Sequence, residues 1–304
     1  MSRIRPRLVV LVNASARQSP RERWRHALSV LEARASVTVS VPPTAGAMSA
    51  AAQAAVNAGV DTVVVVGGDG TVNCVAGTIA GSPVALGVIP LGTGNDFARA
   101  LSIPFDPVAA ARRVLDGSPM PLDVIDVNGR IFCTAGLLGV PADAALTVRR
   151  WLSPGGRMRS LVHVLGGAVY TLAGARHLLS PGLAPRSYGV ELPDATTSQR
   201  ALGIFIANTR VVGGGLVLPV GSDSADGMME VVLIREFPRW RLLYAFVCFA
   251  RGWRIPEGVL ETMPASRATI TCDGIQPFSA DGDLMCESTR FQITVRPGTL
   301  RVIV

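Results

Sequence analysis

The chain has 304 residues with 29 basic and 22 acidic side chains, a formal charge of +7, and every basic residue is arginine. The absence of lysine excludes a Walker-A nucleotide loop, a protein-kinase active site and a pyridoxal Schiff base, because each of them depends on a lysine. Any phosphate group that this protein binds must therefore be met by backbone N–H groups, by arginine or by a metal ion.

Length and composition also bound the architecture and the partners. At about 100–200 residues per domain, the length predicts two domains, and 49% apolar with 17% charged residues is typical of a globular protein. With 5% aromatic residues and no recognisable nucleic-acid motif, we expect no nucleic-acid partner. Five cysteines without a CxxC pair favour reduced thiols in the cytoplasm, and three histidines without metal spacing argue against zinc.

The amino-terminal sequence imitates a signal peptide. Arginines precede the apolar stretch Leu8–Val12, but this stretch is shorter than the usual ~7–15 residues. We interpret it as the first β-strand. No apolar run approaches the ~20 residues that span a bilayer, so we expect a cytoplasmic protein without a spanning helix.

The first third of the chain alternates β-branched runs with helical stretches, as in an α/β fold. We expect strands at 8–12, 37–41, 62–66 and 85–89, and helices at 20–34, 48–58, 71–80 and 95–101. The continuous run Val63–Val66 is typical of a strand that crossover helices bury on both faces. The pattern predicts a parallel sheet in a first domain of residues 1–122.

The pattern changes after about Pro121, where short strand-like segments are separated by glycine, proline and aspartate turns. We expect strands at 125–127, 131–134, 187–192, 203–207, 229–234, 267–271 and 290–295, interrupted by helices around 161–179 and 238–251. Many short strands at this spacing predict a β-sandwich-like second domain, residues 123–295.

The strongest local signal is a glycine-rich turn after a buried strand. Val63–Val66 leads into Gly67-Gly68-Asp69-Gly70-Thr71-Val72-Asn73, which opens a helix. Glycines let backbone N–H groups approach an anion at a helix N-terminus. An aspartate inside such a turn repels phosphate unless a divalent cation lies between them, so Asp69 predicts Mg²⁺ bound together with a nucleotide.

A second turn of similar design follows about twenty residues later. Pro90-Leu91 leads into Gly92-Thr93-Gly94-Asn95-Asp96, where we expect Asn95 and Asp96 to cap a helix. In open α/β sheets ligands bind at the carboxyl ends of the strands, where two such turns converge on one crevice. The alternative is two ordinary turns with Asx caps, but their occurrence as a pair favours a ligand site.

These two segments resemble the most specific motifs of the diacylglycerol kinase catalytic family of bacterial lipid kinases. That family includes sphingosine and ceramide kinases and is distantly related to NAD kinases. The resemblance rests on Gly67–Asn73 and Pro90–Ala98, and it covers nearly the whole chain. It continues in order through Leu122-Asp123, Asn208, Gly213–Gly215, Pro219, Asp226–Met228 and Asp281–Asp283.

The resemblance implies ATP as co-substrate and Mg²⁺ as cofactor. The residues implied to bind ATP are Asn13, Gly67, Gly68, Asp69, Gly70, Thr71, Val72, Asn73, Thr93, Asn95 and Asp96. The acidic network around the Mg²⁺ of the nucleotide, acting through water, would be Asp69, Asp96 and Asp123. A second, structural Mg²⁺ would lie at Asp226, with backbone oxygens near Asp223 and Met228.

The resemblance also implies the reaction and the fold. Asp281 would be the general base that takes the proton from a lipid hydroxyl as it attacks the γ-phosphate of ATP, and Asp283 completes the same catalytic motif. We expect the acceptor to be diacylglycerol and the product phosphatidic acid. The nucleotide would lie between a Rossmann-like first domain and a β-sandwich second domain, with the last strand, about 296–304, returning to the first domain.

Several alternatives stay open at this point. Asp281-Gly282 is also the commonest signal for a two-residue hairpin turn. The acceptor could instead be a soluble molecule, as in NAD kinase. Cys74 and Asp283 stand where the family has glutamate, and Thr134 where asparagine is common, so a nucleotide-binding regulatory protein with weakened catalysis is a third alternative.

Two segments mix arginine with aromatic residues. One surrounds Trp151, from Arg149 to Arg159, and the other runs from Arg235 to Trp253. Such segments can lie on an anionic bilayer, with rings among the headgroups and guanidinium groups on the phosphates; the alternative is an amphipathic helix with a solvated arginine face. A lipid substrate predicts peripheral contact with the inner face of the membrane, and the sequence leaves open whether the protein is a homodimer.

Overall fold

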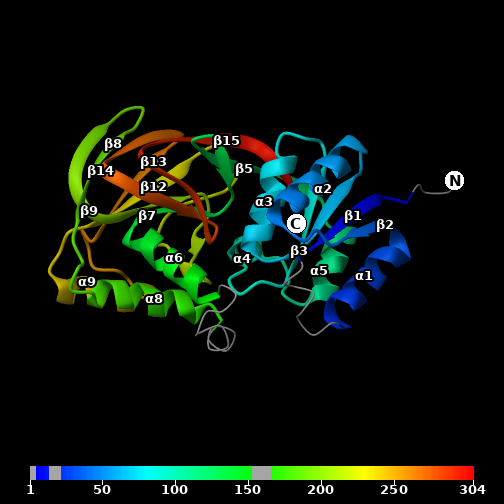
Figure 1. Ribbon diagram of the computed structural model, residues 1–304, viewed down its shortest axis with the longest axis horizontal. Helices are drawn as coiled ribbons and strands as arrows, with labels where there is room; N and C mark the ends of the chain where they lie inside the picture. Colours follow the sequence, from blue (N-terminus) through cyan, green and yellow to red (C-terminus); the bar gives the residue numbers. More distant parts are fainter. Residues whose placement is uncertain (1–4, 14–21, 153–165) are drawn as a thin grey trace. The chain divides into compact units, whose positions relative to one another are not determined.

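The computed structural model describes residues 5–13, 22–152 and 166–304. Two units make up the chain, residues 1–123 with 297–304 and residues 124–296 (Figure 1). Arg157 and Arg159, together with residues 161–165 of the expected helix, lie outside the described residues.

The first unit is built around strands whose β-branched side chains are buried. Its strands are β1 (Arg7–Val12), β2 (Ser36–Ser40), β3 (Thr62–Gly67), β4 (Ala85–Pro90) and the end of β15 (Asp283–Ile303). Their order is β15, β4, β3, β1, β2, and each neighbouring pair is parallel. Every residue of β3 is buried, which explains why its sequence is apolar throughout rather than alternating.

Helices cover the strands of the first unit. They are α1 (Glu22–Arg34), α2 (Ala45–Asn57), α3 (Asp69–Ile79), α4 (Asp96–Ala100) and α5 (Pro107–Asp116). Figure 1 shows α2 beside α3 on one side of the strands and α1 beside α5 on the other.

Capping side chains explain where two of these helices begin. α2 begins at Ala45, before the expected residue 48, because Thr44 Oγ1 accepts a hydrogen bond from the N–H of Ala47 at 3.2 Å. α5 was not expected, although its start carries two ordinary signals. Asp106 Oδ1 accepts from the N–H of Ala109 at 2.9 Å, and Pro107 occupies the first turn.

The second unit is a β-rich body of antiparallel strand pairs. Its strands are the end of β5 (Pro119–Val127), β6 (Arg130–Phe132), β7 (Ala135–Gly139), β8 (Arg186–Glu191), β9 (Thr196–Ala207), β10 (Val211–Val212), β11 (Leu216–Val217), β12 (Met229–Arg235), β13 (Leu260–Ala265), β14 (Arg267–Ala280) and the start of β15. The helices are α6 (Val140–Leu152), α8 (Ala168–Leu179) and α9 (Arg239–Arg251). The expectation of an α/β chain whose second part is rich in strands is confirmed.

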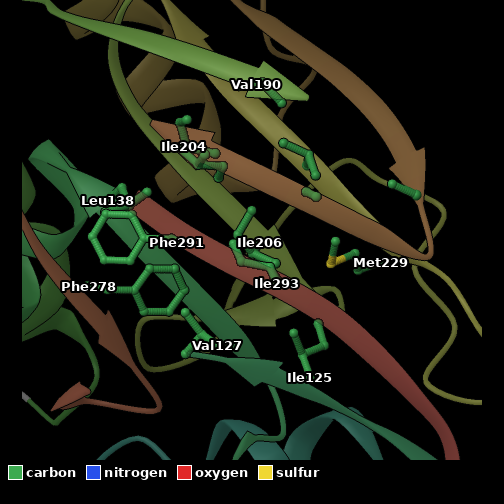
Figure 2. Packing of buried hydrophobic residues seen from close by; sticks show 14 of the residues in the cluster. Ile125, Val127, Leu138, Val190, Ile204, Ile206, Met229, Phe278, Phe291 and Ile293 are labelled. Atoms are coloured by element: carbon green, nitrogen blue, oxygen red, sulfur yellow. The ribbon is translucent and has the colours of Figure 1, made fainter. Parts of the chain in front are cut away.

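Two long strands change partners along their length and fold this sheet over its own core. β9 pairs with β8 through Thr196–Ala201 and with β7 through Gly203–Ala207. β14 likewise pairs with β8 near its start and with β7 at Ser279 and Ala280. The enclosed side chains form one apolar core (Figure 2).

Aromatic side chains fill the part of this core that lies under the end of β14. The ring of Phe278 lies 5.8 Å from that of Phe132 and 5.4 Å from that of Phe291, measured between centroids. Gly136 on β7 faces them, and a Cβ there would overlap the Phe278 ring. These contacts fix the end of β14, where the catalytic aspartate is expected.

The second unit departs from the expected elements at several places. The strand expected at 131–134 ends at Phe132, and β7, α6 and β13 were not expected. Pro141 lies in the first turn of α6, where proline is tolerated, but in a sequence it is a signal of interruption. The helix expected around 161–179 is observed as α8, from Ala168.

Candidate active site

The two glycine-rich turns of the first unit lie against each other, backbone to backbone. The N–H of Leu91 donates to the carbonyl of Gly67 at 2.8 Å. A Cβ added to Gly68 would lie 2.9 Å from the Cα of Gly92, and a Cβ on Gly92 would overlap the Cα of Gly68. Only glycine fits at either position, so the structure brings together the two motifs that the sequence singled out.

Asp69 links the first turn to the helix that follows the second. Its Oδ1 accepts a hydrogen bond from the N–H of Phe97, in the first turn of α4, at 3.1 Å. Burial raises the pKa of the Asp69 carboxyl above its ordinary value, and backbone N–H groups of Phe97, Asp96 and Asn95 oppose this shift. The carboxylate therefore has a structural task, capping α4, beside any contact with a nucleotide.

Asn95 stands at the N-cap position of α4, as expected, but its side chain makes no capping hydrogen bond. It adopts the left-handed conformation with φ of 53°, which asparagine tolerates better than most residues. Its Oδ1 accepts from the N–H of Gly92 at 2.8 Å, and its Nδ2 donates to the carbonyl of Gly92 at 2.9 Å. The side chain thus closes the turn around Thr93, and the cap of α4 comes from Asp69 instead.

Asn13 joins the same cluster from the end of β1. Its Nδ2 donates to Thr71 Oγ1 at 2.6 Å, and its N–H donates to the carbonyl of Val66 at 3.0 Å. The N–H groups of Thr71 and Val72 donate to the carbonyl of Gly68 and so start α3. Three strand ends therefore meet at the glycine-rich turn through hydrogen bonds.

Cys74 belongs to the packing of α3 rather than to this cluster. Its Sγ lies 3.2 Å from Ser49 Oγ and donates to the carbonyl of Ala45 at 3.4 Å, both on α2. The cysteine that stands where the family has glutamate therefore holds two helices together.

The remaining acidic residues of the first unit do not form a metal cage. Asp123 is buried, and its Oδ1 accepts from the N–H of Gly298 at 2.8 Å, which ties β5 to the end of β15. Asp96 is also buried. In the described ranges no three His, Cys, Asp or Glu side chains gather to hold a metal ion. Mg²⁺ that arrives with a nucleotide needs only one or two carboxylates besides phosphate and water, and Asp69 fits that requirement.

In the second unit Asp281 and Gly282 form the two-residue turn between β14 and β15. Ala280 pairs with Asp283 across it, and the φ angles of Asp281 and Gly282 are 50° and 85°. Positive φ at both central residues is the geometry of a type I′ hairpin. The hairpin interpretation is therefore correct. A hairpin turn is compatible with a catalytic role, because hydrogen bonds hold the Asp281 carboxylate in one position.

Asp281 is 9% exposed, and its carboxylate is held by a short turn between β6 and β7. Its Oδ2 accepts from the N–H of Cys133 at 2.9 Å, and its Oδ1 accepts from the N–H of Thr134 at 3.0 Å and of Ala135 at 3.4 Å. The hydroxyl of Thr134 also donates to Oδ1. Donation to Asp281 replaces strand pairing here, which explains why the strand expected at 131–134 is interrupted.

Asn208 supports this turn from the end of β9. Its Nδ2 donates to the carbonyl of Cys133 at 2.8 Å, and its own N–H donates to the carbonyl of Thr134 at 2.9 Å. Burial and the negative charge of Asp281 raise the pKa of the Cys133 thiol well above its ordinary value. The sequence singled out Asn208 only by resemblance, and the backbone donors at 133–135 carry no sequence signal.

Asp283, the second residue of the motif that we expect to be catalytic, is half exposed. Its Oδ1 lies 3.7 Å from Arg149 Nε on α6, an ion pair that the sequence did not suggest. Tyr170 on α8 also lies near the turn, because its hydroxyl oxygen would be 3.6 Å from a Cβ on Gly282. The turn is thus flanked by one arginine and one tyrosine from two helices.

Comparison with known proteins decides the family. A model of the diacylglycerol kinase catalytic domain matches residues 7–127, and a model of the YegS C-terminal NAD kinase beta sandwich-like domain matches residues 157–304. A diacylglycerol kinase of Mycobacterium tuberculosis is 32% identical over 256 residues, which are 82% of this chain and 79% of that one. The chain belongs to the diacylglycerol kinase catalytic family.

Other relatives agree with this assignment. A protein of Pseudomonas aeruginosa named "Probable lipid kinase YegS-like" is 32% identical over 228 residues, 74% of this kinase and 72% of that chain. The crystal structure of a diacylglycerol kinase from Bacillus anthracis shares the fold, with a TM-score of 0.76 at 17% identity over 98% of this chain and 97% of that one. The protein is a lipid kinase, and within its described residues no helix has the length and apolar character to cross a membrane.

A further acidic pair in the kinase lies before β12. Asp226 Oδ1 accepts from the N–H of Met228 at 2.8 Å, and Asp223 Oδ1 accepts from the N–H of Ala225 at 3.1 Å. Glu230 follows, and its Oε2 is buried without a hydrogen-bond donor among the residues that the structure describes. Burial and the charge of Asp226 raise the pKa of the Glu230 carboxyl.

Glu230 was not predicted, because one glutamate at the start of a strand has no distinctive pattern. A buried carboxylate oxygen without a donor, next to a second carboxylate, fits a bound cation. The expected structural Mg²⁺ site therefore has a candidate side-chain ligand, Glu230, beside those that the resemblance implied.

Proposed function

We propose that this lipid kinase transfers the γ-phosphate of ATP to the hydroxyl of diacylglycerol and forms phosphatidic acid. The observation that supports this proposal best is the Asp281 carboxylate, held by three backbone N–H groups and the Thr134 hydroxyl at the tip of a hairpin. A general base must be fixed within reach of the proton that it accepts. The similarity to a chain named diacylglycerol kinase favours diacylglycerol as the acceptor.

In this proposal the Rossmann-like first unit binds the nucleotide. The backbone of the turn Gly67–Asn73 faces the phosphates, except for the N–H groups of Thr71 and Val72, which donate to the carbonyl of Gly68. Thr93, Asn95 and Asn13 complete the site. Asp69, with Asp96 and Asp123 acting through water, holds the Mg²⁺ that accompanies ATP. When bound, Mg²⁺ offsets charge on the phosphates in place of the missing lysine.

The second unit supplies the acceptor side of the reaction. Asp281 accepts the proton of the lipid hydroxyl as that oxygen attacks the γ-phosphorus, and ADP leaves. An alcohol has a high pKa, so the carboxylate takes the proton late in the transfer. Asp283 and its partner Arg149 position the turn from the side of α6.

One finding favours a second candidate acceptor. The family model that matches residues 157–304 describes a sandwich like that of NAD kinase. A soluble nucleotide such as NAD is therefore the alternative acceptor, and its phosphorylation would need no lipid surface. The expected location at the inner face of the membrane stays a prediction.

An acceptor assay tests the proposal. The purified kinase is incubated with γ-labelled ATP and Mg²⁺ in two parallel reactions, one with detergent-dispersed diacylglycerol and one with NAD. We expect label in phosphatidic acid and none above background in NADP. Label in NADP with none in lipid would replace the proposed acceptor.

We also propose that Asp226, Glu230 and the backbone near Asp223 and Met228 bind a divalent cation that stabilises the second unit. At ~100 times its Kd, Mg²⁺ without nucleotide is expected to raise the melting temperature by roughly 5–10 °C. Glu230→Gln is expected to lose that rise, and without the ion it should be at least as stable as the wild type because a buried repulsion is removed.

Scanning calorimetry with and without Mg²⁺ measures this effect. The matched control is Glu236→Gln, because Glu236 is half exposed and pairs only loosely with Arg200, at 3.8 Å. An equal response to Mg²⁺ in the wild type and in Glu230→Gln would show that Glu230 is not a ligand.

A further inference from the structure

Helix α9 exposes large apolar side chains along one face. Trp240 is 71% exposed, Tyr244 is 56% exposed and Val247 is also exposed. Positions i, i+4 and i+7 lie on the same face of an α-helix. The opposite face, with Leu242, Ala245 and Cys248, is buried against the second unit.

The turn that follows α9 extends this face. Trp253 is 57% exposed, directly after the helix ends at Arg251. The guanidinium group of Arg251 lies 5.6 Å from the centre of the Trp253 ring. We call Trp240, Tyr244, Val247 and Trp253 the α9 face. Its exposed aromatic side chains carry a polar group at one end, which suits a boundary between water and an apolar phase.

The charge around the α9 face is mainly positive. Residues 237–256 contain four arginines, at 239, 241, 251 and 254, and the flanking acidic residues are Glu236 and Glu257. Glu257 pairs with Arg254 at 2.8 Å, which leaves three of the four arginines for an anionic partner. Helix α8 and its flanks, residues 166–190, contain no acidic residue. The chain has 22 acidic residues, but the adjoining helices α8 and α9 contain none of them. Their surface therefore complements an anionic partner.

Helix α8 lies against α9 and connects it to the catalytic turn within the second unit. A Cβ on Gly174 of α8 would lie 2.8 Å from the ring of Phe246, so the two helices pack closely there. Leu178 of α8 shares an apolar cluster with Leu242. Near its other end, α8 carries Tyr170, which lies beside Gly282 in the turn that holds Asp281.

We propose that the α9 face docks this kinase onto an anionic lipid bilayer. The rings of Trp240, Tyr244 and Trp253 enter the headgroup region, and the neighbouring arginines contact lipid phosphates. The inference rests on the proposed lipid acceptor, because a diacylglycerol molecule is reached only where the enzyme meets a membrane. It adds to that proposal a defined surface and the charge of the lipid.

Sedimentation with sucrose-loaded vesicles tests the docking surface without ATP. The wild type is expected to bind vesicles of phosphatidylglycerol and phosphatidylcholine and to bind pure phosphatidylcholine far more weakly. The double variant Trp240→Ala, Tyr244→Ala should lose on the order of tenfold in partition. Arg251→Gln should lose about fivefold, and only on anionic vesicles.

The matched control is Ile275→Ala on β14, because Ile275 is 76% exposed and lies outside the α9 face. It should bind vesicles as the wild type does. Label transfer to detergent-dispersed diacylglycerol should be unchanged in all these variants, which shows that they are folded and separates this test from that of the proposed function.

Three results would overturn the docking proposal. The wild type could remain in solution with anionic vesicles, or the double variant could bind them as tightly as the wild type. Alternatively, sedimentation velocity without lipid could show self-association that the double variant abolishes, which would assign the α9 face to a second copy of the chain. Vesicle binding without label transfer to any lipid would instead leave the docking surface standing and contradict the proposed function.

Discussion

Asp281→Asn is expected to lower kcat for lipid phosphorylation by ~10²–10⁴-fold, the usual contribution of a general base. ATP affinity should be unchanged, because the glycine-rich turns belong to the first unit. Asparagine keeps the size of the side chain but has no carboxylate to accept the proton. Turnover is measured by label transfer, and ATP affinity by calorimetry.

The contacts of Asp281 make a stability measurement necessary in the same experiment. In the wild type both carboxylate oxygens of Asp281 accept hydrogen bonds, from the backbone N–H groups of Cys133 and Thr134. In Asp281→Asn the side-chain NH₂ group replaces one of these oxygens and faces a backbone donor instead of accepting from it. The unmatched donors should cost about 1–3 kcal/mol in the free energy of unfolding. Denaturant unfolding at the assay temperature shows whether the variant is still folded.

A matched control distinguishes the loss of the proposed general base from the mere loss of one negative charge near β14. Asp273 lies on the same strand β14 and is exposed, so Asp273→Asn should keep wild-type turnover and stability. Thr134→Val removes one donor but leaves the carboxylate, and should reduce kcat less than Asp281→Asn does. Near-wild-type turnover of a folded Asp281→Asn enzyme would rule out Asp281 as the base.

The second large effect concerns Asp69, for which a pair of variants distinguishes two roles. Asparagine can still accept the N–H of Phe97 through its side-chain oxygen, whereas alanine cannot. Asp69→Asn should therefore keep the contact between the two turns but weaken binding of Mg·ATP by roughly 10–100-fold, the range for a lost group around a metal. Asp69→Ala should in addition lose ~1 kcal/mol of stability with the cap of α4.

Titration calorimetry with Mg·ATP and denaturant unfolding measure these two effects separately. The control is Asp116→Asn, because Asp116 is exposed and pairs with Arg34 on the surface. If Asp69→Asn bound Mg·ATP with wild-type affinity while Asp69→Ala did not, the carboxylate would act as a helix cap alone, and its proposed contact with Mg²⁺ would be wrong.

The first unit was largely predictable because its signals are local. A short run of β-branched residues such as Val63–Val66, followed by glycines, favours a buried strand, and the glycine-rich turn after it marks a helix start within a few residues. The rule that strand ends in an α/β sheet meet at one edge predicted that the two turns converge, and the structure adds the close approach of Gly68 to Gly92. The detail that Asp69 caps α4, 28 residues away, had no sequence signal.

The second unit was less predictable because its important contacts join distant parts of the chain. Asp281 is held by backbone N–H groups 146 to 148 residues earlier, and backbone donors are identical at every residue except proline. The strand expected at 131–134 is present as β6 but ends at Phe132 for this reason. Glu230 could be recognised only from its burial beside Asp226, which depends on tertiary structure.

The most direct test of the account is transfer of label from γ-labelled ATP into a total bacterial lipid extract, with the labelled species identified by mass spectrometry. We predict that the wild type labels phosphatidic acid as the main product and that folded Asp281→Asn labels none. Label in a different lipid would contradict the proposed acceptor. No label in any lipid, from an enzyme that binds Mg·ATP, would contradict the central claim that this chain phosphorylates a lipid hydroxyl.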